Sequence, residues 1–403
     1  MKLSIREDYP RKLVSIPLRV LIVSVSIFVT AISSSCVPAD RPKYSASEAE
    51  RAQISGFENI RAHVDDPRPS AEAYDPWRPV VMKGRPTMLA ISGGGAGGAF
   101  AVGIVSAWSE LGTRPTFEVV TGVSTGALIA PLVFLGPEYD HQLRRLYLSD
   151  ETSGLIDIEW KGAGIFSPSL LQGSALRDTV EENITSEILH RIAREHRVGR
   201  RLLVMTTNID TQRAVIWNIG AIANSDRSDA LPLVRRILLA SASVPGIFPP
   251  VAIKTTVDGK DIEELHSDGG SSAQFFTLPE HLLVAGNNRA RGQNLHIYVI
   301  VNNALMPEFS MARARALPIM GRAYGILLKS QTKQGLIALY NFAQRSRIDL
   351  DIASIDAQVP YSMADPFNAS YMRSVYLIGY RNTLNQRLWS KRPIFAPPPI
   401  IKQ

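Results

Sequence analysis

The sequence predicts an α/β fold, a three-layer sandwich in which a mostly parallel central sheet carries helices on both faces. Short apolar runs typical of buried strands alternate with longer segments of helical spacing. The strand-like runs are almost continuously apolar, as expected where helices cover both faces of a sheet. With 45% hydrophobic and 20% charged residues over 403 positions, the composition is that of a globular protein with a sizeable core.

The N-terminal region predicts export. Five basic residues occur within the first 19 positions, and the apolar-to-small run 20–35 leads to the single cysteine, Cys36. A basic start, an apolar middle and small residues at the end are typical of a signal peptide. The segment resembles a bacterial lipoprotein signal with Cys36 as the lipidated residue, although Ser33 stands where a leucine-like residue is usual. We expect residues 1–36 to be this signal or an uncleaved membrane anchor, with simple secretion and a buried core helix as the other readings.

The remaining chain divides into a linker, one domain and a tail. Residues 37–85 are polar and contain many prolines, so we expect a linker with a helix at 45–63 and an extended tether over 65–86. The compact domain is expected over 86–390. The Pro-rich residues 391–403 cannot continue a regular element.

Within the domain, apolar runs and helical spacing define the expected elements in order. Terminal glycines and turn residues separate them. The expected strands are 87–92, 117–123, 201–209, 213–219, 262–265, 294–302 and 374–380, and the expected helices are 99–112, 125–136, 231–243 and most of 311–346.

A serine between two glycines joins an expected strand to an expected helix. Gly122, Ser124 and Gly126 match the pattern G-x-S-x-G. In a nucleophile elbow the serine occupies a strained turn, and the glycines remove side chains that would collide across it. The hydroxyl then lies at the carboxyl end of the strand, beside the positive end of the helix. Alternatively Ser124 caps the helix, a role that requires neither glycine.

A glycine-rich run follows the first expected strand. Gly93, Gly94 and Gly95 leave backbone N–H groups uncovered, so they can form an oxyanion hole or an anion nest. A dinucleotide-binding turn also fits, since Gly93, Gly95 and Gly98 match G-x-G-x-x-G and Glu118 lies 20 residues further on. In that motif the acid ends the second strand, whereas Glu118 begins it. A purely structural turn stays open, and a P-loop is excluded because no Gly-Lys-Ser/Thr follows.

The third motif is an aspartate before two glycines. Asp268, Gly269 and Gly270 follow the expected strand 262–265 and match an ordinary tight turn. Next to an activated Ser124, however, Asp268 is the leading candidate to accept the hydroxyl proton. A carboxylate can do this if burial raises its pKa and a hydrogen bond holds it against the hydroxyl.

The order of GGGAGG, then GVSTG about thirty residues on, then DGG resembles the patatin-like phospholipase family, as does ASASVPGIFPPV at 240–251. The resemblance implies a sheet sandwiched by helices and a Ser–Asp dyad that hydrolyses acyl esters of lipids without a catalytic histidine. It makes Ser124 the nucleophile and Asp268 the general base. It also implies an oxyanion hole formed by the backbone around Gly94 and Gly95, aided by the Thr125 amide. One departure is Gly97, where the family often carries Lys or Arg.

A Ser–His–Asp esterase is the alternative mechanism. In that class the base follows the acid along the chain, so it would have to be His281 or His296. His296 is expected in a core strand and His281 at an exposed helix start. His266 would share a strand face with Asp268 and support it.

Other features predict less. Asn208 and Asp210 end an expected strand and either line a pocket or form a turn, and Arg177 is interpreted as a solvated helix residue. No spaced set of metal ligands occurs, so no metal or cofactor is expected. A net charge of +7 without an Arg/Lys stripe predicts no nucleic-acid partner.

The expected partners are a lipid acyl ester and a membrane surface of the cell envelope. The other class of function is a non-catalytic lipid-binding envelope protein.

Overall fold

A computed structural model describes residues 41–57, 59–66, 85–149, 173–285, 295–309, 311, 314–356, 359 and 367–395. The predicted signal or anchor of residues 1–36, with Cys36, lies outside these ranges. From Lys43 onward the chain forms one compact unit. Within the described ranges, no helix combines the length and apolarity needed to cross a membrane.

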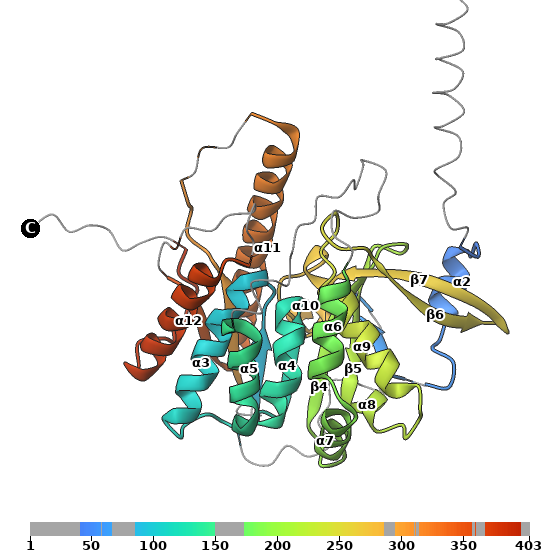
Figure 1. The fold of residues 1–403 in the computed structure, drawn as a ribbon, viewed down its shortest axis with the longest axis horizontal. Coiled ribbons are helices and arrows are strands. Elements are labelled where there is room, and N and C mark those ends of the chain that lie inside the picture. The colour runs from blue at the N-terminus through green and yellow to red at the C-terminus, as the bar shows by residue number, and fades with distance from the viewer. Residues whose placement is uncertain are drawn as a thin grey trace, which may run out of the picture. The chain divides into compact units, whose positions relative to one another are not determined.

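A mixed sheet of nine strands forms the centre of this unit (Figure 1). Its middle is parallel, in the order β4 (Arg201–Asn208), β3 (Val119–Val123), β2 (Thr87–Ile91), β8 (His296–Ala304) and β9 (Asp349–Ile355). Antiparallel strands β5 (Arg213–Asn218) and β1 (Arg61–His63) extend it beyond β4. The hairpin of β6 (Val251–Val257) and β7 (Lys260–Asp268) also joins β4.

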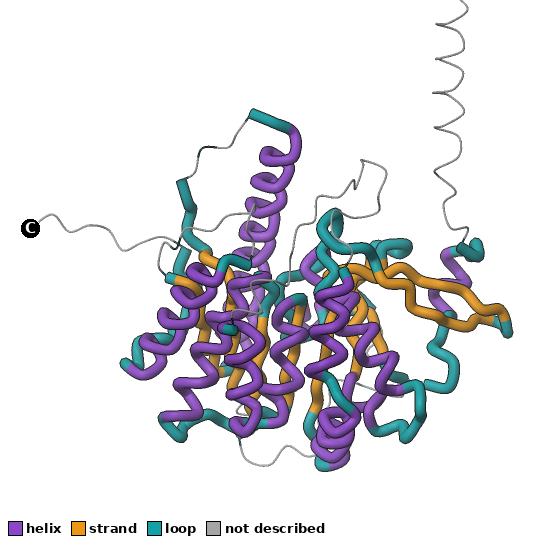
Figure 2. Tube along the Cα trace, viewed as in Figure 1, coloured by secondary structure: helices purple, strands orange, loops and turns teal. Residues whose placement is uncertain are grey.

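Helices cover both faces of the sheet, which confirms the three-layer prediction (Figure 2). Alternate residues of β2 point to opposite sides: Leu89 and Ile91 belong to one core, whereas Met88 and Ala90 belong to the other. The first core is closed by α3 (Gly98–Glu110), α4 (Thr125–Leu135), α5 (Asp140–Leu148), α6 (Ser174–Asn183), α7 (Ser186–Arg197), α8 (Ile219–Ala223), α9 (Ala230–Ser241) and α12 (Ala369–Leu384). The second is closed by α10 (Glu280–Ala285) and α11 (Ala316–Ser346).

The expected strand 374–380 is wrong, because these residues lie within α12. A short apolar run of this kind fits a buried helix as well as a strand, since its length does not reveal the period. The helix begins where the Asn368 side chain accepts a hydrogen bond from the Tyr371 amide. It packs on α3 so closely that a Cβ at Gly379 would lie 2.4 Å from the Phe100 carbonyl oxygen.

The expected helix over 45–63 is only partly present. Helix α2 (Ala46–Arg51) starts at a capping box between Ser45 and Glu48 and ends after one and a half turns. Strand β1 follows and pairs with β5. The described part of the predicted linker therefore packs on the compact unit, and the expected tether lies mostly outside the described residues.

The contact between α3 and α12 makes a stability prediction. A Cβ at Gly103 of α3 would lie 2.1 Å from the Tyr376 carbonyl oxygen. We expect Gly103→Ala to lower the free energy of unfolding by about 2–4 kcal/mol, because neither backbone can yield without losing packing. Urea denaturation measures this.

Gly325 of α11 is the matched control, since it too is a helix-interior glycine and, among the described residues, no atom outside the adjacent helix backbone lies within 4 Å of the position of its Cβ. Gly325→Ala should raise the free energy of unfolding by about 0.5–1 kcal/mol through helix propensity. Equal stability of the wild type and Gly103→Ala would contradict the close helix contact.

Candidate active site

Strand β4 brings the predicted serine and aspartate together. It pairs with β3 as far as Met205, opposite Val123, and from Thr206 onward it pairs with β7, whose Asp268 lies opposite Thr206. The ends of β3 and β7 therefore occupy consecutive positions along one strand. As a result the Ser124 Oγ donates a hydrogen bond of 2.5 Å to the Asp268 Oδ2, across 144 positions of sequence.

Ser124 occupies a strained elbow that depends on both flanking glycines. Its φ of 55° and ψ of −125° are unusual for a residue with a side chain. A Cβ at Gly122 would lie 2.4 Å from the Gly126 carbonyl oxygen, and a Cβ at Gly126 would lie 2.2 Å from the Ile91 carbonyl oxygen. The helix-capping interpretation is wrong, because the Ser124 side chain makes no capping hydrogen bond.

Ser241, at the end of α9, hydrogen-bonds to the backbone of the elbow. Its hydroxyl donates to the Met205 carbonyl oxygen at 2.7 Å and accepts the Ser124 backbone amide at 3.1 Å. The hydroxyl thus links the elbow to the middle of β4. The sequence reading missed this residue, because a serine near the end of a helix has no local pattern that indicates a distant partner.

Asp268 is a buried carboxyl group held at both oxygens. Its side chain is 2% exposed, the Oδ2 accepts from Ser124, and the Oδ1 accepts from the Gly270 amide at 2.6 Å. Burial raises the pKa of Asp268 to about 7, although these two hydrogen bonds act to lower it. The carboxyl group can therefore give and take a proton near neutral pH.

The glycines after the aspartate allow its turn. A Cβ at Gly269 would lie 2.5 Å from the Met205 carbonyl oxygen, and a Cβ at Gly270 would lie 2.5 Å from the Gln274 Nε2. The tight-turn interpretation of this motif and the acid interpretation thus describe the same local structure, in which the turn aims the Asp268 carboxylate.

The glycine-rich loop lies against the serine. A Cβ at Gly93 would lie 3.1 Å from the Cβ of Ser124. The expectation that Gly93 supplies an oxyanion donor needs correction, because its amide already donates to the Gln274 carbonyl oxygen at 2.9 Å. That acceptor lies far along the chain, so no local pattern reveals it. Gly93 instead gives the loop room to approach Ser124.

Three predicted amides are available as donors. Within the described ranges, the backbone N–H groups of Gly94, Gly95 and Thr125 donate to no protein acceptor. Gly94 and Gly95 have φ values of 152° and 54°, which favour glycine. Thr125 is the first residue of α4, so its amide adds the positive end of the helix dipole beside Ser124. These amides can stabilise negative charge near the hydroxyl.

Asn302, on β8, shapes the glycine loop and was also missed from sequence. Its Nδ2 donates to the Ser92 carbonyl oxygen, and its Oδ1 accepts the Ala101 amide. A Cβ at Gly94 or Gly97 would lie 2.5 or 2.0 Å from the Asn302 carbonyl oxygen. Gly97, where the resemblance would place Lys or Arg, therefore has no space for a side chain.

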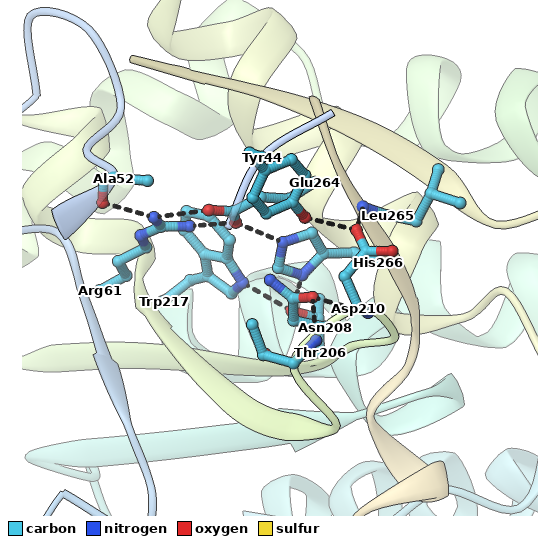
Figure 3. A network of polar contacts seen from close by, with 11 residues as sticks. Tyr44, Ala52, Arg61, Thr206, Asn208, Asp210, Trp217, Glu264, Leu265 and His266 are labelled. Atoms are coloured by element: carbon cyan, nitrogen blue, oxygen red, sulfur yellow. Dashed lines mark hydrogen bonds and ion pairs between the residues drawn. The ribbon is translucent and has the colours of Figure 1, made fainter. Parts of the chain in front are cut away.

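A buried polar chain links β5, β4 and β7 (Figure 3). The Trp217 indole donates to Thr206, whose hydroxyl is 2.9 Å from the His266 Nδ1. The His266 Nε2 lies 3.1 Å from Glu264, which accepts two hydrogen bonds from Arg61. Burial lowers the pKa of His266, so a neutral ring that donates through Nε2 fits this chain of donors and acceptors.

The same network joins the N-terminal segment to the strand that carries the acid. Burial alone would raise the pKa of Glu264, but the hydrogen bond with His266 and the charge of Arg61 lower it to about 2. Arg61 lies on β1 and also donates to the Ala52 carbonyl oxygen. His266 thus supports β7 through Thr206 and Glu264, and it does not contact the serine.

The other histidines lie elsewhere in the fold. His296 is at the first residue of β8, the sheet edge opposite the elbow, and its Nε2 lies 2.6 Å from Asp351. His281 is on α10. In the described part of the chain, no histidine hydrogen-bonds to Ser124 or Asp268.

The remaining sequence candidates form ordinary structure. The Asn208 Oδ1 accepts the Asp210 amide at 3.0 Å, which is the turn interpretation of this pair. Arg177 lies on α6. Over the residues that the structure describes, no group of three His, Cys, Asp or Glu side chains is placed to hold a metal ion.

Comparison with known proteins identifies a family for the segment that carries the site. The family model described as Patatin-like phospholipase matches residues 89–281. A curated relative, the "cGAMP-activated phospholipase" of Escherichia coli (strain TW11681), is 23% identical over 203 residues, which are 47% of this chain and 53% of the relative. The match thus spans about half the length of that relative.

Two solved structures have similar chains. VipD from Legionella pneumophila has a TM-score of 0.40 at 11% identity, covering 88% of this chain and 72% of that chain. The type III effector protein ExoU has a TM-score of 0.30 at 13% identity, covering 75% of this chain and 53% of that chain. Likeness at these scores supports neither a chemistry nor a substrate.

The raised pKa of Asp268 makes a stability prediction. Its pKa is about 7 when folded against 3.8 as the ordinary value, so only the folded protein holds this proton between those pH values. The contribution of Asp268 to stability therefore falls as the pH rises from about 4 to about 7. Asp268→Asn removes this loss, so its stability relative to the wild type should improve by about 2–4 kcal/mol between pH 4 and pH 8.

Urea denaturation of both proteins at a series of pH values measures the difference. A constant difference between the two proteins across that range would show that the Asp268 carboxyl group titrates normally.

Proposed function

Because residues 89–281 match the family model described as Patatin-like phospholipase, we propose that this protein is a serine lipid acyl hydrolase. It releases a fatty acid from a membrane lipid ester, as a phospholipase A or lysophospholipase does. The observation that carries the proposal is the 2.5 Å hydrogen bond from Ser124 to a buried Asp268 whose pKa is about 7.

In the first step the Ser124 Oγ attacks the ester carbonyl carbon while Asp268 accepts the hydroxyl proton. The carbonyl oxygen becomes an oxyanion, which the amides of Gly94, Gly95 and Thr125 stabilise by roughly 3 kcal/mol per donor. The carbon–oxygen bond to the alcohol then breaks. Asp268 returns the proton to the leaving alkoxide, and the acyl group stays on Ser124 as an ester.

In the second step Asp268 takes a proton from a water molecule as that water attacks the acyl carbonyl carbon. The same three amides stabilise the second oxyanion. The bond to the Ser124 Oγ breaks, the proton on Asp268 returns to that oxygen, and the fatty acid leaves. One carboxyl group is sufficient for both steps, because its pKa allows it to be base and then acid.

The cellular setting is part of the proposal. The basic and apolar residues 1–36, ending at Cys36, support attachment to a membrane of the bacterial cell envelope as a lipoprotein or through an uncleaved anchor. Such attachment would hold the site near its lipid supply.

Release of fatty acid from a lipid ester tests the function directly. We expect Ser124→Ala to reduce kcat by at least about 10⁴-fold, because it removes the nucleophile. His281→Ala and His296→Ala are the controls and should keep activity within about threefold of the wild type. Full activity of Ser124→Ala would refute the assignment, and a loss of several hundredfold in either histidine variant would favour a Ser–His–Asp mechanism.

The pH profile of kcat/KM on a soluble monomeric ester tests the role of Asp268. The base must be ionised, so the rate should rise about tenfold per pH unit below pH 7 and level off above it. At pH 5 we expect about 1% of the plateau rate. A profile that is flat from pH 5 to pH 8 would exclude a carboxylate base with this pKa.

A further inference from the structure

A stripe of large apolar side chains is exposed along the first half of α11. Ile319, Met320, Ile326 and Leu327, here called the α11 stripe, are 52%, 64%, 60% and 66% exposed. Ile319 and Met320 are adjacent and lie two helical turns before Ile326 and Leu327, so all four fall on one face of the helix. Contiguous exposed apolar side chains of this size indicate a docking surface for a partner or a membrane.

The helix that carries the stripe lies beside the candidate active site. Helix α11 follows β8 at the carboxyl edge of the sheet, where β3 also ends at Ser124. The Tyr324 hydroxyl hydrogen-bonds to Ser271, and the Gln331 Nε2 donates to the Ser272 carbonyl oxygen at 2.5 Å. Both partners immediately follow the Asp-Gly-Gly turn. Figure 2 shows the first turns of α11 extending beyond the strands.

Tyr324 of α11 lies close to Asp268 of the candidate active site. Burial and the nearby charge of Asp268 raise the pKa of Tyr324 to about 12, against the hydrogen bond with Ser271. Tyr324 is four residues from Met320 and three from Leu327, so it borders the stripe. The helix therefore contacts the acid turn directly beside the apolar side chains that it exposes.

Positive charge borders the stripe. Arg322, Lys329 and Lys333 follow one another at helical spacings of seven and four, so they line one side of it. Arg322 and Lys329 donate to the backbone carbonyl oxygens of Glu308 and Met306, and the charge of Glu308 also acts on Lys329. Glu308 is the single acidic residue between positions 305 and 348, so the surface has a net positive charge.

We propose that the α11 stripe, with its bordering cations, docks this protein on the surface of a bilayer that contains anionic lipids. An apolar helix face flanked by Lys and Arg is the arrangement that lies in the interface of such a bilayer. The proposal rests on the proposed hydrolase function and deepens it. It turns the carboxyl edge of the sheet, with Ser124, toward the lipid esters, so that a substrate leaves the bilayer beside the α11 helix.

A fluorescent label tests the docking in the full chain. Leu327→Cys, in a Cys36→Ser and Ser124→Ala background, places an environment-sensitive dye on the stripe without lipid turnover. Val198→Cys is the matched control, because Val198 is 64% exposed but lies between α7 and the start of β4, at the opposite edge of the sheet.

Vesicles of phosphatidylcholine and phosphatidylglycerol in a 7:3 ratio should shift the emission of the Leu327→Cys label to shorter wavelength and leave the Val198→Cys label unchanged. Because the N-terminal segment is the same in both proteins, attachment through it cannot produce the difference. Equal responses of the two labels would overturn the proposal. A concentration-dependent shift without vesicles would also overturn it, in favour of a second copy of the chain as the occupant.

Activity supplies the second readout. The double variant Ile326→Asp with Leu327→Asp should hydrolyse vesicle phospholipid at least about tenfold more slowly than the wild type, and a soluble monomeric ester within about twofold of it. Val198→Asp should leave both rates unchanged. Unchanged vesicle hydrolysis in the double variant would refute the docking surface. A wild type that hydrolyses neither substrate while the Leu327→Cys label still enters vesicles would refute the hydrolase function and support the docking.

Discussion

The whole site depends on how strand β4 is shared between two neighbours. Its first five residues pair with β3, and its last three pair with β7. Because the change of partner falls between Met205 and Thr206, the serine at the end of β3 and the aspartate at the end of β7 occupy adjacent positions. A shift of one residue in either ladder would turn the side chains to the other face of the sheet and break the contact. The geometry of the candidate active site is thus a consequence of strand register.

This register places one residue in a strained backbone conformation and buries one carboxyl group. Ser124 has a positive φ, and Asp268 lies in surroundings that oppose its charge. Packing and hydrogen bonds elsewhere offset both: Ser241 ties the elbow to β4, and the ion pair of Arg61 with Glu264 ties β7 to the N-terminal segment. Such a buried pair contributes little net stability, but losing one partner would leave an uncompensated charge. We therefore interpret it as a device that fixes the position of β7.

The sequence predicted well what is decided locally. Side chains at Gly122 and Gly126 would collide with atoms of the same turn or of the adjacent strand. The G-x-S-x-G motif therefore predicts the elbow by itself. Interactions between distant segments had no such signal. The Gly93 amide is engaged by Gln274, and Ser241 and Asn302 support loops far from them in the sequence. Strand β1 has only three residues, too few for an alternating pattern, and residues 374–380 are apolar enough for either a strand or a buried helix.

A crystal structure of the protein after reaction with a fluorophosphonate ester tests the convergence of these groups most directly. The account predicts a bond from phosphorus to the Ser124 Oγ, with the phosphoryl oxygen within hydrogen-bond distance of the amides of Gly94, Gly95 and Thr125. The Asp268 carboxyl group should remain beside the modified oxygen. Phosphorus attached to a different residue, or a phosphoryl oxygen directed away from those amides, would contradict the account.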